Sequence, residues 1–477
     1  MNPRDIARVV LSTGSGRVGA VFLAALALVS LFVLVRFPLD FGSTRWNNPA
    51  VWADNPKAAA PAWTRLWAGD GAVGHAVFEA AQPSTRGLLG EGEQRDYVFT
   101  YDYTGGKLPT FMALAVSDVR FTSRPPVLTL AVRRPDGRVL TLSQTVVRGP
   151  RPGEPPPYLR HQDAPLRISL SGDPEALASV KEFLAQEYRV NLAAEALQGK
   201  VADAVFGAPS EGSPGQFQPL PGVYVFTLQE VAGSPSDATG SVKLVLGGSV
   251  YGVMGTDALG RDLALGLLFG FPVALAIGIA TSLFATAIGA ALGILSGYLA
   301  GKTDLAIQRL SDIWSNVPLL PILIFLIFIL GQKLWLVVVI MILFGWPGLT
   351  IVVRSMVLQI RSGQLVEATQ ALGASKGRIM FRHLLFQIAP FLFAQMIFFT
   401  PGAILAEAGL SFLGLGDPSI PTWGQILESG FRTGAVYVGY WWWVLPPGLL
   451  IVATAMTFVL LTLGLEPVVN PRLRENR

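Results

Sequence analysis

The stretch "LALGLLFGFPVALAIGIATSLFATAIGAALGILSGYLAG", residues 263–301, decides the fold class because it contains no charged side chain. A helix needs about 20 apolar residues to cross the hydrocarbon core of a bilayer, and this run is longer than one crossing requires. Pro272 interrupts the run, so we predict a short interfacial helix before Pro272 and a membrane-spanning helix over residues 273–300. The chain is therefore expected to be an α-helical integral membrane protein.

The composition of the 477-residue chain also indicates a membrane protein. Charged residues make up 14% of the sequence, hydrophobic residues 51%, and the mean hydropathy is +0.48. Soluble domains carry roughly 25% charged residues. The absence of Cys excludes disulfides, thiolate catalysis and Cys-ligated metal sites, and three scattered His make a His-rich metal centre unexpected. The net charge of +4 fits basic cytoplasmic loops better than a surface that binds nucleic acid.

Five further apolar stretches have the length of a membrane crossing. The first lies between Arg17 and Arg36, and we interpret it as an uncleaved span because no small-residue cleavage site follows it. The five stretches cover residues 18–35, 313–332, 334–353, 384–406 and 440–465. Together with residues 273–300 they give six predicted transmembrane helices.

Lys and Arg are unevenly distributed over the segments that flank these spans. They gather before the first span, between the second and third, between the fourth and fifth, and after the sixth. Cytoplasmic loops carry the excess of Lys and Arg. We therefore expect both termini in the cytoplasm and residues 37–250 on the opposite, extracytoplasmic side.

Three parts of the chain follow from this topology: residues 1–36 with the first span, an insertion over residues 37–250, and a core over residues 251–477. Alternating runs in the insertion, such as "DYVFTYDY" and "GVYVFTLQEV", predict strands, and residues 173–207 have helical spacing. We expect a mainly β, sandwich-like domain with a helical insertion. Its Trp-rich beginning, residues 47–71, either lies along the membrane surface or packs on the domain.

Small residues recur every four positions in the second span, at Gly289, Gly293, Gly297 and Gly301. This spacing lets helix backbones approach closely in a membrane, so we expect these glycines to pack against another helix. The overlapping stretch "GYLAGKT" is one residue too short for a phosphate-binding loop and follows a helix rather than a strand. We therefore expect no cofactor on this chain, and any ATP and Mg²⁺ would be bound by a partner.

The stretch "VEATQALGASKGRIMFRHLLFQIAP", residues 366–390, is a charged interruption between two apolar spans. Its pattern predicts a helix, a turn at Gly373 and a second helix near the inner membrane surface. Two interpretations stay open at this point. The segment is either a basic amphipathic loop on anionic lipid or a docking site for a cytoplasmic partner.

Several motifs occur in the order that is typical of one family. The stretch "EATQALGASKGRI", residues 367–379, resembles the EAA loop of ABC-importer permeases. "GTDALGRD" (255–262), "EAGLSFLGLGDPSIPTWGQIL" (407–427) and the terminal "NPRLR" resemble the C-type subunit of dipeptide/oligopeptide permeases. The resemblance is close over residues 250–477 and loose over residues 1–36. Thr369 and Phe386 depart from the family pattern, and the family has a short loop where this chain has residues 37–250.

The resemblance implies the fold of a type I ABC-importer permease in a prokaryotic cell membrane. Such a chain pairs with a homologous second permease, binds two cytoplasmic ATPase subunits and receives substrate from an extracytoplasmic solute-binding protein. It is not itself an enzyme, and its substrate class is peptides, with nickel chelates and some sugars also handled by the family. Within the cytoplasmic loop 354–383, the segment 366–383 would couple ATP hydrolysis to transport. The residues expected to contact the ATPase are Glu367, Ala368, Ala371, Gly373, Lys376 and Arg378.

Two further motifs carry candidate functional residues. Glu407 is an acidic residue near the external end of a span, where an ionisable group is expected to be functional. It either forms an outer gate or lies in the headgroup layer; the gate residues would be Glu407, Ser411, Phe412, Leu413 and Gly414. The second motif is expected to form a structured elbow before the second span, with Asp257 and Asp262 as helix caps and Arg261 paired with one of them. The elbow residues are Gly255, Thr256, Asp257, Gly260, Arg261 and Asp262.

Two other functions compete with an importer. A membrane-anchored sensor, with a β domain that binds a ligand or partner, would explain residues 37–250 but leaves the other motifs unused. A secondary transporter would need ionisable residues deep within its spans, and the predicted spans have almost none.

Overall fold

The computed structural model describes residues 3–68, 71–210 and 212–469, and it divides the chain into two compact units. Unit 1 comprises Met1–Pro49 and Leu263–Arg477, and unit 2 comprises Ala50–Asp262. The boundaries predicted from the sequence lie at residues 37 and 250. The structure instead assigns residues 37–49 to the first unit and residues 251–262 to the second. The terminal "NPRLR" motif lies outside the described residues.

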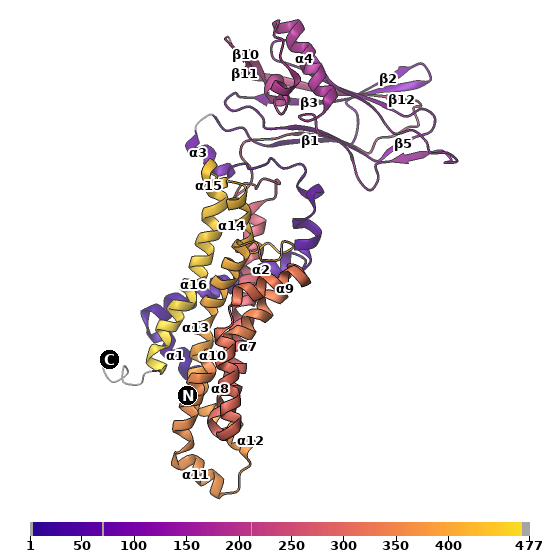
Figure 1. Ribbon diagram of the computed structural model, residues 1–477. Helices are drawn as coiled ribbons and strands as arrows, with labels where there is room; N and C mark the ends of the chain where they lie inside the picture. The colour runs from indigo at the N-terminus through magenta and orange to yellow at the C-terminus, as the bar shows by residue number, and fades with distance from the viewer. Residues whose placement is uncertain (1–2, 69–70, 211, 470–477) are drawn as a thin grey trace. The chain divides into compact units, whose positions relative to one another are not determined.

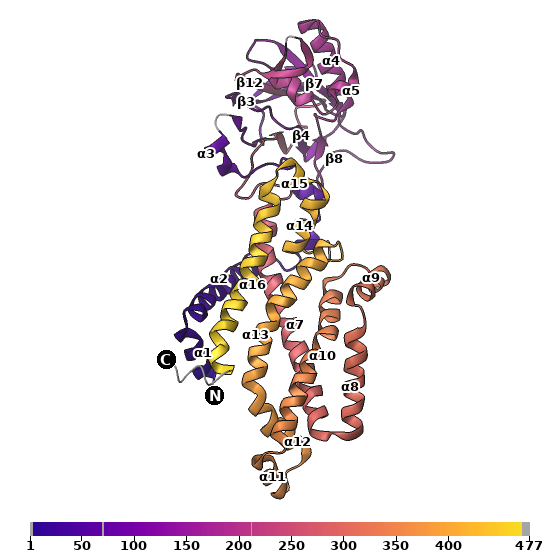
Figure 2. The same ribbon diagram turned by 60° about the vertical axis from the view of Figure 1, so that its left-hand side comes forward.

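Unit 1 is helical (Figure 1). Its α-helices are α1 (Pro3–Ser12), α2 (Gly14–Arg36), α7 (Leu263–Leu299), α8 (Gly301–Asn316), α9 (Leu319–Leu330), α10 (Leu334–Arg361), α11 (Gln364–Ala371), α12 (Lys376–Arg378), α13 (Leu385–Phe412), α14 (Trp423–Arg432), α15 (Ala435–Val438) and α16 (Trp441–Val469). Two π-helical turns, η1 (Gly42–Trp46) and η5 (Ile379–Leu384), complete the unit. α7 packs against α10 and α13, and α16 packs against α2 and α13, as Figure 2 shows.

Five helical stretches in the described part of the chain are long and apolar enough to cross a membrane. They are Gly14–Arg36, Leu263–Leu299, Leu334–Arg361, Lys376–Phe412 and Trp441–Leu465. A sixth span is reached only when α8 and α9 are counted together. The helical membrane character predicted from the sequence is therefore confirmed, and the count of six depends on this pair.

The predicted break at Pro272 is wrong, because α7 continues through that residue. Proline removes one helical hydrogen bond and disturbs the carbonyl four residues earlier, but membrane helices tolerate it where neighbours supply other partners. Here the indole Nε1 of Trp423 donates to the carbonyl of Leu267 at 2.9 Å, next to the disturbed turn. The apolar run is thus one helix rather than an interfacial helix followed by a span.

The predicted third span, residues 313–332, is not one straight helix. α8 begins already at Gly301 and ends at Asn316, and α9 leaves it at an angle of 79°. Val317, the residue between them that precedes Pro318, is extended with φ −77° and ψ 125°. A residue before proline disfavours the helical region, which explains the bend.

Unit 2 is mainly β and contains two larger antiparallel sheets. The first has the order β1 (Ala76–Ala80), β13 (Ser241–Leu246), β4 (Met112–Ser117), β9 (Leu166–Ile168). The second has the order β2 (Thr85–Leu89), β3 (Gly92–Tyr103), β12 (Gly222–Ala232), β6 (Val127–Arg133), β7 (Val139–Val146). Two small pairs are β5 (Val119–Phe121) with β8 (Tyr158–Arg160) and β10 (Gly207–Ser210) with β11 (Ser213–Pro219).

The core of unit 2 is built from alternate residues of its long strands. Tyr224, Phe226 and Leu228 of β12 are buried in one cluster with Leu114 of β4 and Leu244 of β13. Since these strands belong to the two different sheets, their apolar faces share one core, as in a sandwich.

The helical part of unit 2 begins as the sequence predicts. Asp173 caps α4 (Pro174–Tyr188), and its side chain accepts a hydrogen bond from the amide of Ala176. The helical run does not extend to residue 207 without interruption, because Arg189 turns left-handed and two short helices follow. These are α5 (Ala194–Leu197) and α6 (Val201–Phe206).

The Trp-rich segment has no uniform environment. It contains short turns at Pro49–Trp52 and Ala62–Thr64 and the helix α3 (Arg65–Ala68). Trp52 is buried, whereas the side chain of Trp67 is 76% exposed. Trp52 and Trp67 therefore differ in exposure, and both interpretations of the segment stay predictions.

Candidate functional site

The segment between α10 and α13 forms a helix, a left-handed turn and a second helix, as predicted. α11 ends before Gly373, whose φ of +79° lies in the region that glycine adopts most readily. A Cβ at Gly373 would meet no other atom within 4 Å, so only its backbone conformation demands glycine. After this turn, the hydroxyl of Ser375 accepts a hydrogen bond from the amide of Arg378 at the start of α12.

Two buried residues anchor this segment to unit 1. Val366 of α11 and Ile379 belong to a cluster with Val353 and Val357 of α10 and Leu384. The residues expected to meet an ATPase are exposed: Glu367, Ala368, Ala371, Gly373, Lys376 and Arg378. Leu372 is also 88% exposed. One face of the segment therefore packs against the helices of unit 1, and the other face is exposed.

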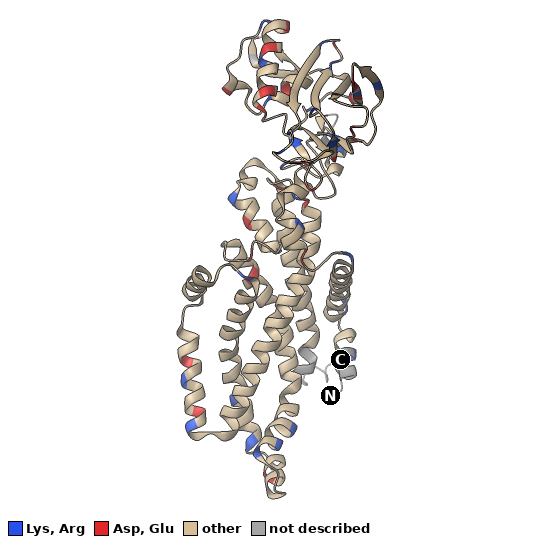
Figure 3. Ribbon diagram, turned by 90° about the vertical axis from the view of Figure 1, so that its right-hand side faces the viewer, with Lys and Arg blue, Asp and Glu red and all other residues tan. Residues whose placement is uncertain are grey.

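An ion pair joins three helices at the same end of the bundle. Asp304 of α8 accepts hydrogen bonds from Arg354 of α10 at 2.5 and 2.6 Å, and from Ser296 of α7 at 2.5 Å. Gln370 of α11 lies 3.4 Å from the hydroxyl of Tyr298 at the end of α7. Figure 3 shows Lys and Arg positions gathered at the end of unit 1 that carries α11. This ion pair was not predicted from the sequence, because Asp304 and Arg354 are 50 residues apart and several other charged residues stand near them in α8 and α10.

Three of the four spaced glycines lie where α7 meets α10. A Cβ at Gly289, Gly293 or Gly297 would lie 2.6 to 3.0 Å from atoms of Leu349, Val353 or Val357, respectively. These contacts leave no room for a side chain between the two helices. The prediction that Gly301 packs against another helix is wrong. Gly301 begins α8 with φ +58°, and a Cβ there would meet nothing within 4 Å. Its role is in a turn rather than in helix packing.

Glu407 is buried in α13 and does not lie in an exposed surface layer, since only 4% of it is exposed. Its carboxylate accepts a hydrogen bond from the hydroxyl of Ser411 at 2.7 Å. Ser411 is itself buried, Phe412 is half-buried, and Leu413 is 61% exposed. Gly414 follows with φ +78° and ends the helix. The predicted gate residues therefore lie together, and Glu407 points into the protein.

The turn after α13 is hydrogen-bonded to the hairpin tip, which is the connection between α9 and α10 at residues 331–334. Asp417 is buried and accepts hydrogen bonds from the amide of Leu334 at 3.2 Å and from the amide of Ser419 at 3.0 Å. Gln332 donates to the carbonyl of Gly414 at 2.5 Å. Asp417 belongs to the motif at residues 407–427, but its role in holding Leu334 was not predicted from the sequence.

The predicted elbow is a closed loop at the end of unit 2. Asp257 is almost fully buried, accepts hydrogen bonds from the amides of Leu259 and Arg261, both at 2.9 Å, and pairs with Nε of Arg261 at 2.5 Å. The backbones of Thr256 and Asp262 form an isolated antiparallel β-bridge across the loop. Gly255 and Gly260 have φ of +73° and +79°. Asp257 therefore caps a turn rather than the start of a helix, and the expected pairing with Arg261 is present.

No group of three or more His, Asp or Glu in the described ranges is arranged to hold a metal ion. The candidate residues form three polar clusters in the described part of the chain. These clusters are the segment 364–378 with the Asp304–Arg354 pair, the Glu407–Asp417 region, and the loop 255–262.

Comparisons with known proteins identify relatives of the chain. A family model described as "binding-protein-dependent transport system inner membrane component" matches residues 289–475. The dipeptide transport system permease protein DppC of Bacillus subtilis (strain 168) is 34% identical over 221 residues, which cover 46% of this chain and 68% of that protein. The oligopeptide transport system permease protein OppC of the same organism is 33% identical over 222 residues, covering 46% of this chain and 72% of that protein.

Among solved structures, the inward-facing MetNI methionine ABC transporter matches with 20% identity and a TM-score of 0.35, covering 42% of this chain and 94% of the matched one. The family model begins at residue 289, so unit 2 lies outside it. The two Bacillus relatives are each more than 30% identical to this chain across more than two thirds of their own length. The chain therefore belongs to the binding-protein-dependent transport system inner membrane components, and within that family it is of the dipeptide/oligopeptide permease type.

Proposed function

We propose that this chain forms half of the translocation pathway of an ATP-driven importer that carries peptides into a prokaryotic cell. A homologous permease would form the other half, and an extracytoplasmic solute-binding protein would deliver the peptides. The substrate class comes from the names of the relatives, which are dipeptide and oligopeptide permeases. The chain itself would hydrolyse no ATP and bind no cofactor.

The observation that carries this proposal is the two-faced segment 364–378. Its buried residue Val366 and the adjoining buried Ile379 connect it to α10 and to the start of α13, so a displacement of the segment would be passed on to both helices. Its exposed face offers the carboxylate of Glu367, the small side chains of Ala368 and Ala371, and two cations. These features suit a groove on a cytoplasmic ATPase. Closure of the ATPase pair would then move the segment as a rigid body and tilt the helices attached to it.

The Asp304–Arg354 ion pair would make neighbouring helices move together when the segment is displaced. Because it ties α8 to α10 and also engages α7, the three helices would move together rather than slide past one another. Gln370 is within 3.4 Å of Tyr298 and would connect α11 to the same group. The basic residues around this end agree with a cytoplasmic location.

The opposite end of unit 1 would carry the outer gate. Glu407, Ser411 and the turn at Phe412, Leu413 and Gly414 are proposed to rearrange when the pathway opens outward. Such a rearrangement would have to break the hydrogen bond between Ser411 and Glu407. The loop 255–262 would be a structured element that precedes α7 in the chain, since Asp257 and Arg261 pair within the loop. Unit 2 would lie on the extracytoplasmic side.

The test is peptide uptake by cells in which the gene for this chain is deleted and then restored. Uptake of radiolabelled trialanine is expected to fall to background in the deletion strain and to return with the intact chain. The variant Glu367→Lys is expected to reach the membrane in normal amount and to restore little uptake, because it reverses the charge offered to the ATPase. Unchanged uptake after deletion would show that peptide import is not the function. A sensor with a ligand-binding β domain would give that result.

A further inference from the structure

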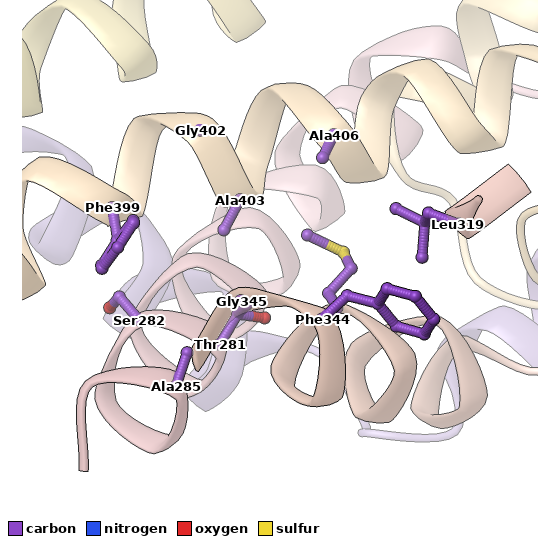
Figure 4. A pocket seen from close by; sticks show the side chains of 11 residues that line it. Thr281, Ser282, Ala285, Leu319, Phe344, Gly345, Phe399, Gly402, Ala403 and Ala406 are labelled. Carbon is purple, nitrogen blue, oxygen red and sulfur yellow. The ribbon is translucent and has the colours of Figure 1, made fainter. Parts of the chain in front are cut away.

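Unit 1 contains an open cavity of about 220 Å³ lined by residues of α7, α9, α10 and α13 (Figure 4). Apolar side chains form most of its wall, among them Leu319, Met341, Phe344 and Phe399. None of the predicted gate or ATPase-contact residues lines it. The cavity is therefore a feature that the motifs did not reveal.

One polar group in this wall has no partner. Thr281 of α7 is 6% exposed, and its Oγ1 is buried without a hydrogen bond to any described residue. Its neighbour Ser282 differs, because Ser282 donates to the carbonyl of Ile279 and accepts from the hydroxyl of Thr400. A buried hydroxyl without a partner is unfavourable, because it has given up its hydrogen bonds to water and gained none in return. Thr281 lines the cavity (Figure 4), where an incoming polar group would satisfy its hydroxyl.

The volume limits what the cavity can hold. Pockets for drug-sized ligands measure roughly 300–1,000 Å³, so a whole peptide would not fit. An apolar cavity of about 150 Å³ accommodates one benzene molecule, so the present volume suits one aromatic or branched aliphatic side chain.

The surroundings of the cavity indicate access and a binding role. Gly402 and Ala406 of α13 line it and are exposed, so the cavity opens on a face of this chain. A Cβ at Gly402 would meet nothing within 4 Å. Leu319 is the first residue of α9, directly after the 79° bend from α8. Discontinuous helices line the substrate sites of many membrane transporters.

We propose that this cavity is a specificity subsite that receives one apolar side chain of a peptide in transit, with Thr281 Oγ1 hydrogen-bonded to an adjacent peptide group. The inference rests on the proposed peptide import and adds to it a preference among peptides. The apolar wall would bind the side chain, and the hydroxyl would distinguish a peptide from a purely hydrocarbon occupant.

The test compares uptake of two labelled tripeptides, Ala-Phe-Ala and trialanine, by cells that carry the full transporter. Gly402→Leu adds a branched side chain at the opening, where a Cβ would meet nothing within 4 Å, and Ala406→Leu adds one from the next turn of α13. The matched control is Gly348→Leu on α10, since Gly348 is also exposed, has no neighbour within 4 Å of its Cβ position and does not line the cavity. Loss of an apolar subsite typically changes selectivity by about 10–200-fold.

Either filling variant is expected to lower the uptake ratio of Ala-Phe-Ala to trialanine at least about tenfold, whereas Gly348→Leu leaves the ratio unchanged. Thr281→Val is expected to reduce uptake of both peptides several-fold, and Thr281→Ser to retain it. A ratio that stays constant in both filling variants would overturn the subsite. If the intact transporter takes up neither peptide, the proposed function fails, and this failure is visible before any variant is compared.

Discussion

The packing of α7 against α10 leads to a prediction that can be worked out in detail from Gly293. A Cβ at this position would lie 2.6 Å from the Cβ of Val353 and 2.9 Å from the carbonyl oxygen of Thr350. Both neighbours belong to α10, and one is backbone, so Gly293→Ala must push the two helices apart. Gly348→Ala is the control, because its added methyl group would meet no atom within 4 Å.

The expected magnitude follows from two opposing effects. Overpacking of a close contact costs about 1–3 kcal/mol. Replacing Gly by Ala inside a helix contributes about 1 kcal/mol of stabilisation at both positions, and this gain cancels when the two variants are compared. The free energy of unfolding of Gly293→Ala should therefore lie about 1–3 kcal/mol below that of Gly348→Ala.

The assay is unfolding of the full chain in detergent by titration with sodium dodecyl sulfate, followed by circular dichroism. The second substitution Val353→Ala removes the side-chain atoms nearest to the new methyl group and should recover part of the loss. Gly289→Ala should be milder than Gly293→Ala, since its nearest atoms lie at 3.0 Å and not at 2.6 Å. If Gly293→Ala unfolds at the same detergent composition as Gly348→Ala, the two helices do not pack as described.

Three other predictions concern separate parts of the chain. Gly373→Asp should leave the chain inserted and abolish peptide uptake, because a side chain disfavours the φ of +79° in the turn; uptake at the normal rate would remove the segment from the coupling role. Asp417→Ala should free the amide of Leu334 and increase deuterium uptake at the hairpin tip in hydrogen-exchange mass spectrometry, whereas unchanged exchange would contradict the hydrogen bond at 3.2 Å. The hydrogen bond from Arg160 lowers the pKa of Glu154 to about 2, so the ion pair stabilises the fold above the ordinary pKa of a glutamate and loses this effect as the pH falls toward 2. Glu154→Gln should therefore lower the melting temperature of the detergent-solubilised chain at pH 6, and the difference from the unsubstituted chain should shrink toward pH 2.5; a difference independent of pH would contradict the pKa.

The membrane spans could be predicted from the sequence where the length of an apolar run alone determines whether a helix forms. The helices around residues 18–35, 334–353, 384–406 and 440–465 all exist, although most extend beyond the predicted limits. The two errors both involve proline. Pro272 was expected to break a helix that α14 supports through a side chain of Trp423, and Pro318 bends a span that was expected to be straight. The effect of a proline depends on whether a neighbouring element supplies hydrogen bonds, and a single sequence does not show that.

The candidate sites also fall into two groups, those that could be predicted from the sequence and those that could not. Local chemistry predicted the turn at Gly373, the cap at Asp173 and the Asp257–Arg261 pair, because the interacting residues are close in sequence. Contacts across long separations were missed, such as the ion pair between Asp304 and Arg354. The cavity was missed as well, since it depends on which faces of four helices meet.

The central claim is that the exposed face of the segment 364–378 lies in the cytosol and is covered there by an ATPase. The most direct measurement uses Leu372→Cys, because this residue is 88% exposed and the natural chain contains no other Cys. A membrane-impermeant maleimide is added to inside-out and right-side-out vesicles, with and without the purified ATPase subunits. The account predicts labelling only in inside-out vesicles, and protection when the ATPase subunits are added. Labelling in right-side-out vesicles, or labelling that the ATPase leaves unchanged, would contradict it.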